Sequence, residues 1–438
     1  MANRYWVGGT ASWDATALLK WSSTSGGLGG EAVPTAADNV YFDAASGAST
    51  VTLSGARTCL NFSSAGFTGT ISGTGTLAVS GGATFGAGGT YSNTGTWTFN
   101  ATSGTNNITS NGKSFAFAMV FNGAGGTWTL QDALTLGAIN AVTLTNGSID
   151  LNSKNLTCGT FSSTNSNTRS ITFGTGQIYL TGSAATIFTI ATATGFSLTG
   201  TPVVNCTYSG STGTRTINAG GNATITEANT VSFNVTAGTD IVAIGTSQSV
   251  KNLNFTGFAG TFNNVSGFRV FGNYALSAGM TLVAGTGGTT FSATSGTQQI
   301  TTNSKTLDFP LTFNGIGGTF AFQDALAQGS TRAFTITNGT VKLKAGVTSI
   351  VGSFATTGTI QKFLQSTLAG SRATLSQASG IVNASYLTIK DIIATGGATW
   401  NAFTTNNNVD AGNNLGWDFS TQLGHYMYTR RKNKRILP

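Results

Sequence analysis

The chain repeats part of its own sequence. Residues 99–151 align without gaps on residues 291–343, at an offset of 192, and 28 of the 53 positions are identical. Nine of the 25 differences exchange one apolar residue for another, such as Trp128 for Phe320, whereas turn residues such as Asn146-Gly147 are the same in both copies. Fixed turns around an interchangeable apolar interior indicate a duplicated structural scaffold.

Short stretches of alternating apolar and polar residues recur inside and outside the repeat. They have four to six residues and are bounded by small or turn-forming residues, as in Gly69-Thr-Ile-Ser-Gly, Gly95-Thr-Trp-Thr-Phe-Asn and Gln177-Ile-Tyr-Leu-Thr-Gly. β-Sandwiches use longer strands. The rhythm therefore predicts an all-β chain folded as an elongated β-solenoid, a right-handed parallel β-helix with capped ends and roughly 20–25 residues per turn. An Asn-Gly hairpin remains the alternative at some turns, which leaves the strand direction open there.

The composition fits stacked coils and excludes several other classes of protein. Hydrophobic residues make up 39% of the chain and 28 residues are Phe, which is too much apolar material for a disordered chain. Four prolines among 438 residues exclude a collagen-like chain. Charged residues amount to 8%. Low charge suits a solenoid, because each residue lies directly above and below its counterparts and like charges would repel, whereas Thr and Asn ladders hydrogen-bond along the stack.

Both ends of the chain differ from its body, because five of the seven tryptophans lie there: Trp6, Trp13, Trp21, Trp400 and Trp417. A solenoid must cover its hydrophobic ends. We therefore expect these rings to belong to caps, with a platform for stacking carbohydrate as the alternative. The predicted division is an N-terminal Trp-rich module or cap at 1–45, a β-solenoid body at 46–395 that contains both repeat copies, a C-terminal cap at 396–420 and a basic tail at 421–438.

The formal net charge of +8 is concentrated in the tail. Five of the 21 basic residues lie there, which leaves 16 against 13 acidic residues elsewhere. A nearly neutral body gives no reason to expect nucleic-acid binding. The tail cluster is a candidate contact for an anionic partner, with a solvated chain end as the alternative. Its residues are Arg430, Arg431, Lys432, Lys434 and Arg435.

Residues that usually carry metal or nucleophilic chemistry are few. The single histidine, His425, cannot form a His-rich zinc site, and a Ser-His-Asp triad would have to borrow it from the tail. Three cysteines at spacings of 99 and 48 fit neither a disulfide framework nor a zinc pattern, so we expect buried thiols at Cys59, Cys158 and Cys206. We predict no metal and no cofactor. We also predict no membrane insertion, because no run of about 18 apolar residues is present.

Acidic residues are too sparse to suggest an enzyme. A glycosidase needs two carboxylates a few ångströms apart. Asp132 and Asp324 occupy matching positions of the two repeat copies, and we predict that each accepts hydrogen bonds from turn amides at a coil corner. The remaining pair that one coil face would bring together is Glu227 and Asp240. We expect no catalytic residue.

Several segments of the chain resemble segments of known repetitive proteins. The N-terminal segments are similar to a module that begins repetitive surface and fibre proteins: Tyr5-Trp-Val-Gly-Gly-Thr-Ala-Ser-Trp-Asp and Asp38-Asn-Val-Tyr-Phe. The body resembles repetitive β-helix fibre- or tailspike-like structural proteins of environmental tailed bacteriophages, on the segments Phe121-Asn-Gly-Ala-Gly-Gly-Thr-Trp-Thr-Leu-Gln-Asp and Leu144-Thr-Asn-Gly-Ser-Ile-Asp-Leu-Asn. These are scaffold motifs, so the resemblance carries over no catalytic residue.

The resemblance implies a non-enzymatic structural protein of the virion, a fibre- or spike-like rod that contacts the host surface. The expected partners are other virion proteins and a host cell-surface glycan, and the family implies a homo-oligomer, expected to be a trimer. Met1-Ala-Asn-Arg-Tyr-Trp lacks the apolar core of a signal peptide, so we expect synthesis in the host cytoplasm and release by lysis. The alternatives are a tailspike-like polysaccharide hydrolase or lyase and a bacterial surface adhesin.

Overall fold

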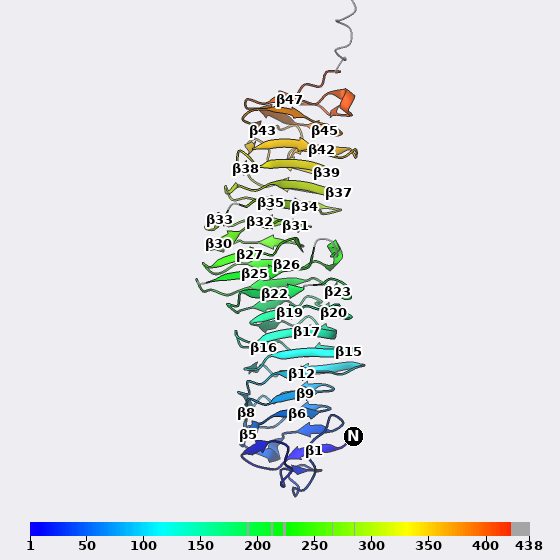
Figure 1. Ribbon diagram of the computed structural model, residues 1–438, viewed down its shortest axis with the longest axis vertical. Helices are drawn as coiled ribbons and strands as arrows, with labels where there is room; N and C mark the ends of the chain where they lie inside the picture. The colour runs from blue at the N-terminus through cyan, green and yellow to red at the C-terminus, as the bar shows by residue number, and fades with distance from the viewer. Residues whose placement is uncertain (191, 212, 222–224, 265, 284, 422–438) are drawn as a thin grey trace, which may run out of the picture. The chain divides into compact units, whose positions relative to one another are not determined.

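The computed structural model describes residues 1–421 apart from 191, 212, 222–224, 265 and 284. The chain divides into two compact units, Met1–Val283 and Ala284–Pro438. Within each unit the strands lie in successive layers (Figure 1). The helices in the described part are three single 3-10 turns: η1 (Ala44–Ser46), η2 (Glu227–Asn229) and η3 (Thr404–Asn406).

Three groups of strands build the first unit. The largest group is a 19-stranded sheet, formed by β1 (Asn3–Trp6), β3 (Trp21–Ser22), β4 (Asn39–Tyr41), β6 (Ala56–Cys59), β7 (Phe62–Ser63), β9 (Thr76–Val79), β10 (Ala83–Thr84), β12 (Trp97–Phe99), β13 (Thr105–Thr109), β15 (Met119–Leu130), β17 (Ala141–Asp150), β19 (Thr160–Ser163), β20 (Arg169–Thr172), β22 (Thr186–Ile190), β23 (Phe196–Thr199), β25 (Thr214–Asn218), β27 (Ile241–Ile244), β30 (Thr261–Asn263) and β33 (Thr281–Val283). A four-stranded sheet consists of β2 (Ala11–Trp13), β5 (Thr50–Leu53), β8 (Thr70–Gly73) and β11 (Thr90–Tyr91). The third group is β14 (Ser114–Phe115), β16 (Leu134–Leu136), β18 (Leu156–Cys158), β21 (Ile178–Leu180), β24 (Val203–Cys206), β26 (Ser232–Val235), β28 (Gln248–Val250), β29 (Leu253–Asn254), β31 (Phe268–Val270) and β32 (Tyr274–Ala275).

Three groups of strands also build the second unit. The first is β34 (Thr289–Phe291), β35 (Thr297–Thr301), β37 (Leu311–Phe322), β39 (Ala333–Leu343), β41 (Ser353–Thr356), β42 (Lys362–Ser366), β45 (Leu387–Lys390) and β48 (Val409–Asp410). The second is β36 (Thr306–Leu307), β38 (Ala327–Gln328), β40 (Thr348–Val351), β43 (Ala373–Gln377) and β46 (Ile392–Thr395). The third is the pair β44 (Ile381–Asn383) and β47 (Thr399–Asn401).

Parallel stacking of successive coils defines both units. Trp97 pairs with Leu77 of the coil before and with Met119 of the coil after, both in parallel register. Leu343 likewise pairs in parallel with Ser366 of the following coil. Contacting residues therefore lie about 20–25 positions apart, one turn of a coil. The prediction of an all-β parallel β-solenoid is confirmed.

The Asn-Gly turns are corners of the coil, so the hairpin alternative is wrong at these positions. Strand β17 runs through Asn146 and Gly147 without a break. Its first half pairs with β19 and its second half with β20, all in parallel. Gly147 adopts a left-handed φ of 77°, which a residue with a side chain reaches at a steric cost. The chain thus bends at Asn-Gly and continues into the next face.

The two repeat copies fold alike. Strands β13 to β17 of the first copy recur as β35 to β39 of the second, and the same core rings stack: Phe99 on Phe121 at 5.2 Å and Phe291 on Phe313 at 5.1 Å. Trp128 and its counterpart Phe320 are both fully buried. The predicted duplication is confirmed as a repeated core. The hand of the coil and the division at 45, 395 and 420 stay predictions.

No described helix has the length and apolarity to cross a membrane.

Candidate functional site

The corner aspartates have the structural role that their repetition predicts. Oδ1 of Asp132 accepts the backbone N–H of Ser110 at 2.7 Å, and Oδ1 of Asp324 accepts that of Thr302 at 3.0 Å. A second oxygen of Asp324 accepts the N–H of Asn303 at 2.5 Å. Both carboxylates thus tie one coil corner to the previous one.

The acidic pair considered for catalysis is divided between two cations. Asp240 is fully buried and accepts a hydrogen bond from Nη2 of Arg215 at 2.8 Å, with a second, shorter contact from Nε. Glu227 lies 2.7 Å from the ammonium of Lys251. Each carboxylate is therefore engaged in an ion pair with a different cation.

The cysteines are free and fully buried, as predicted. Burial raises the pKa of the Cys158 and Cys206 thiols to about 12 and the pKa of the Cys59 thiol further still. Such thiols stay protonated near neutral pH and are poor nucleophiles. Within the described ranges, no group of three or more His, Cys, Asp or Glu side chains could hold a metal ion.

The N-terminal tryptophans form a closed aromatic cluster. Trp6, Trp13 and Trp21 are at most 1% exposed and pack around Phe42 at ring distances of 5.8–6.0 Å. Strand β3 makes an antiparallel pair with β1 that places Trp6 opposite Trp21. The carbohydrate-platform alternative is wrong for these three rings, because no ring face is open.

The C-terminal tryptophans lie in another stacked coil. Trp400 is 4% exposed, and its ring centroid lies 4.9 Å from that of the half-buried Trp417. The adjacent Asn401 continues a side-chain ladder, since its Nδ2 donates to Oδ1 of Asn383 at 2.8 Å. The two rings pack against each other near the end of the described chain, with Trp400 in the core and Trp417 at its edge.

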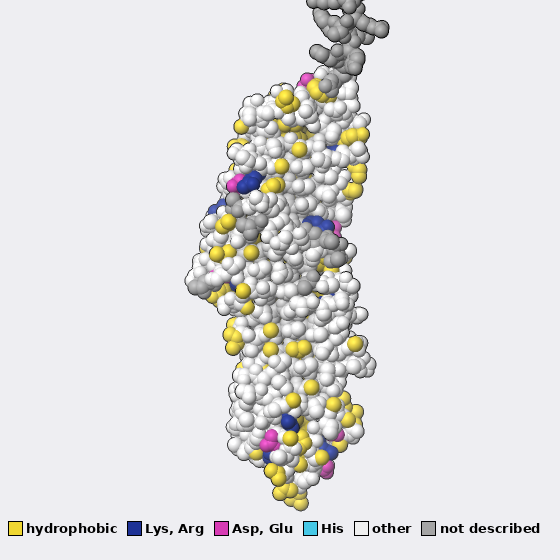
Figure 2. All heavy atoms as spheres, in the orientation of Figure 1, with side chains coloured by type: hydrophobic (Ala, Val, Ile, Leu, Met, Phe, Trp, Pro, Cys, Tyr) yellow, Lys and Arg dark blue, Asp and Glu magenta, His cyan; other side chains and the backbone are white. Residues whose placement is uncertain are grey.

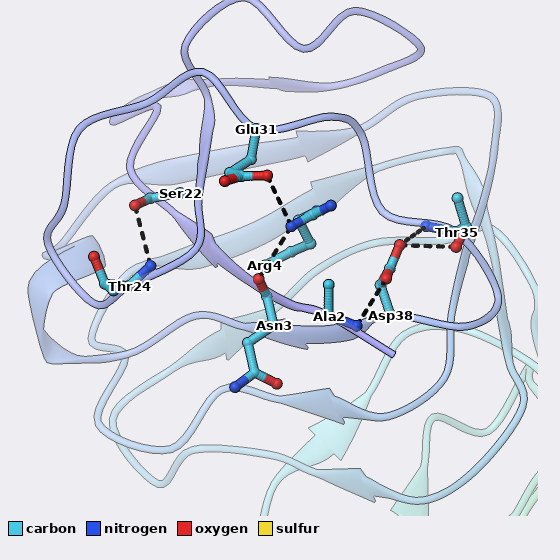
Figure 3. Close-up of polar contacts among 8 residues, drawn as sticks. All are labelled: Ala2, Asn3, Arg4, Ser22, Thr24, Glu31, Thr35 and Asp38. Carbon is cyan, nitrogen blue, oxygen red and sulfur yellow. Dashed lines mark hydrogen bonds and ion pairs between the residues drawn. The ribbon is translucent and has the colours of Figure 1, made fainter.

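A polar network ties the N-terminal module together (Figure 3). The carboxylate of Asp38 accepts hydrogen bonds from the N–H of Ala2 at 3.1 Å and from the N–H and hydroxyl of Thr35 at 3.0 and 2.7 Å. Arg4 pairs with Glu31 at 3.0 Å. Burial alone would raise the pKa of Asp38, but the hydrogen bonds outweigh it and hold that pKa below the ordinary value of 3.8.

The structure describes neither the basic tail nor the histidine. His425 and the candidate anion contacts Arg430, Arg431, Lys432, Lys434 and Arg435 lie outside the described residues.

A concave surface next to the N-terminal module is the candidate site that sequence reasoning missed. It has a volume of about 290 Å³ and lies over β4, β7, β10 and the start of β13. We call it the Tyr41 hollow. Its outward-facing lining residues are Tyr41, Asn61, Ser63, Gly82, Thr84, Thr105 and Asn107.

An amide ladder reaches the hollow and stops there. Nδ2 of Asn39 donates to Oδ1 of Asn3 at 3.0 Å, and Nδ2 of Asn61 donates to Oδ1 of Asn39 at 2.9 Å. The next residue in this row is Gly82, whose N–H donates to Oδ1 of Asn61 at 2.8 Å. Gly82 has no side chain, so the ladder has a gap before Asn107 in the following coil.

A second row steps down from aromatic rings to small hydroxyl residues. Tyr5 and Tyr41 stack at a centroid distance of 4.7 Å and an interplanar angle of 16°. The register then places Ser63 next to Tyr41 and Thr84 next to Ser63. Tyr5 thus stacks on one face of the Tyr41 ring, and the neighbour on the other side is the small Ser63, which lines the hollow together with Tyr41.

In the sequence, the amide row that reaches the hollow is marked by the residue that precedes each buried core position. Asn39, Asn61, Gly82 and Asn107 each precede an inward apolar residue that pairs across neighbouring strands. The glycine is the odd member of this set. Only the strand register shows that the four residues form one row, because the spacings between them along the chain are unequal.

Comparison with known proteins gives no relative: no protein-family model, curated protein or solved structure matches the chain.

Proposed function

We propose that this chain is a non-enzymatic structural protein of a bacteriophage virion, a fibre- or spike-like component that contacts the host surface. The observation that carries the proposal is the stacked parallel ladder, repeated with the same core in two copies. Such a ladder satisfies nearly every backbone group within the stack and needs no cofactor to hold its form.

The surface of the ladder supports a mechanical role. The face in Figure 2 is covered mainly by backbone and uncharged polar side chains, with few charged groups. Side-chain amide ladders run between coils, as in Asn205, whose Oδ1 accepts from Nδ2 of Asn234 at 2.9 Å. These ladders add cross-coil hydrogen bonds without placing like charges above one another.

The carboxylates support a non-enzymatic role over a polysaccharide hydrolase or lyase. Asp132 and Asp324 are used at corners, and Asp240 is buried against Arg215. A glycosidase keeps two carboxyl groups accessible to one sugar, roughly 5–10 Å apart. These three acids are committed to structural contacts instead.

Immunogold labelling of purified virions tests the placement. Labelling on the particle is expected, and a clean particle preparation without label would overturn the proposal in favour of a bacterial adhesin. Incubation of the purified chain with host envelope polysaccharide should give no depolymerisation. Release of oligosaccharides, lost on replacement of one acidic residue, would favour the enzyme.

We further propose a homo-oligomer, with the trimer that such fibre proteins adopt. Light scattering of the purified full chain is expected to give three times the 44.5 kDa chain mass. A monomer at micromolar concentration would contradict this part of the proposal.

A further inference from the structure

We infer that the Tyr41 hollow binds one or two uncharged sugar residues through the open face of Tyr41 and the exposed amide and hydroxyl groups beside it. The inference rests on the proposed contact with the host surface and names both the place and the chemical class of that contact. The volume of the hollow, about 290 Å³, is near the lower end of the range of volumes of ligand sites, roughly 300–1,000 Å³.

The ring of Tyr41 offers an apolar face in a fixed orientation. It is half-buried, and its stack with Tyr5 at 4.7 Å holds it against one side. On the other side its register partner is Ser63, whose small side chain cannot cover the ring, and Tyr41 itself lines the hollow. Sugar rings carry patches of C–H groups that pack on such a face, while the hydroxyl of Tyr41 remains available as a polar group.

Polar groups around the ring are free to bind hydroxyls. Oδ1 of Asn107 accepts Nε2–H of Gln131 at 3.0 Å, which orients the Asn107 amide and leaves the NH₂ group of Asn107 without a partner among the described residues. The hydroxyls of Thr84 and Thr105, which border the hollow, likewise have no hydrogen-bond partner in the described part of the chain. A ligand can thus gain hydrogen bonds here without breaking any protein contact.

The lining selects against other ligand classes. It contains no Lys, Arg, His, Asp or Glu, so nothing in it would neutralise an acidic sugar or a nucleic-acid phosphate. Its outward side chains are mostly polar, which disfavours an apolar ligand. Strands β7 and β10 are each paired on both sides, so a peptide cannot add to them as a further strand.

The gap in the amide ladder is what makes the site. Gly82 replaces the asparagine that would continue the row from Asn61. A Cβ at Gly82 would lie 2.7 Å from the carbonyl oxygen of Asn107. The close approach of the neighbouring coil therefore keeps this position empty of side chain and the hollow open.

Binding can be tested with the full chain on an array of immobilised neutral and acidic oligosaccharides. Hits would then be measured by saturation-transfer-difference NMR with the corresponding methyl glycosides. Ser63→Tyr extends the tyrosine stack into the hollow and is expected to abolish binding. Ser72→Tyr places the same ring on an outward position of β8, away from the hollow, and should bind as the wild type does. Asn107→Ala should weaken binding about tenfold.

Three results would overturn the inference: no neutral glycan bound by the wild type, a preference for acidic glycans, or binding unchanged in Ser63→Tyr. Circular dichroism should first show that both tyrosine variants fold. Virion labelling reports separately on the proposed function. A labelled particle with no glycan binding removes this inference alone, whereas glycan binding without labelling removes the virion role alone.

Discussion

The backbone N–H of Ser110 donates a 2.7 Å hydrogen bond to Oδ1 of Asp132, a residue one coil later, and Thr302 makes the same contact with Asp324 at 3.0 Å. The repeat has therefore copied a corner contact along with its apolar core. We therefore expect Asp132 and Asp324 each to stabilise the fold at its own coil corner.

Replacement of Asp132 by Ala leaves the buried N–H of Ser110 without this acceptor. We expect the free energy of unfolding to fall by about 1–2 kcal/mol. Asp132→Asn keeps one acceptor oxygen and should lose less. Denaturant unfolding followed by circular dichroism measures both, with Asp324→Ala as the internal replicate. An unchanged midpoint for both alanine variants would contradict the corner role.

Two glycines of the repeat lie so close to the backbone of the previous coil that a side chain would not fit there. A Cβ at Gly123 would lie 1.8 Å from the carbonyl oxygen of Ala101 in the previous coil, and one at Gly315 would lie 2.0 Å from that of Ala293. We expect Gly123→Ala to destabilise the chain by about 1–3 kcal/mol through forced displacement of that coil. Gly279→Ala is the matched control, because its nearest atom is 3.9 Å away. Equal thermal midpoints for the two variants would refute the packing argument.

The solenoid could be predicted because its signal is local. Strand rhythm, Asn-Gly corners and the offset of 192 are all visible along the chain, and uncharged rows follow from stacking. The role of Asp132 followed from its reappearance as Asp324. None of these predictions depends on which residues become neighbours in adjacent coils.

The Tyr41 hollow could not be predicted, because it depends on those lateral neighbours. Tyr5 stacks on Tyr41 across 36 positions, but Ser63 follows after 22. Residues inserted in the N-terminal module shift the register, so no constant period reveals the row. The ion-pair partner of Asp240 could not be predicted for the same reason. Arg215 lies one coil earlier, whereas the sequence suggested Glu227 as the residue on the same coil face.

The buried pair of Arg215 and Asp240 should be costly to break from one side. Both side chains are at most 1% exposed, and the guanidinium lies 5.1 Å from the ring of Tyr208. Asp240→Leu alone leaves a buried cation, and we expect a loss of about 3–5 kcal/mol. The double variant Arg215→Met with Asp240→Leu removes both charges and should recover much of that loss. A double-mutant cycle in denaturant measures the coupling, and additive losses would show that the pair does not interact.

The lowered pKa of Asp38 predicts that the stability of the protein depends on pH. Its folded-state pKa lies below the ordinary 3.8, since its hydrogen bonds with Thr35 and Ala2 outweigh burial. A depressed carboxyl pKa contributes stability that is fully present well above pH 3.8 and is lost as the pH falls through the folded-state pKa. Asp38→Asn cannot ionise and lacks this contribution at every pH. The stability difference between wild type and variant should therefore be largest near neutral pH and should shrink as the pH falls below about 4. Tryptophan fluorescence during denaturation measures this, because it reports on the nearby cluster of Trp6, Trp13 and Trp21. A stability difference that stays constant from pH 7 to pH 3 would show that the charge of the Asp38 carboxylate does not stabilise the N-terminal module.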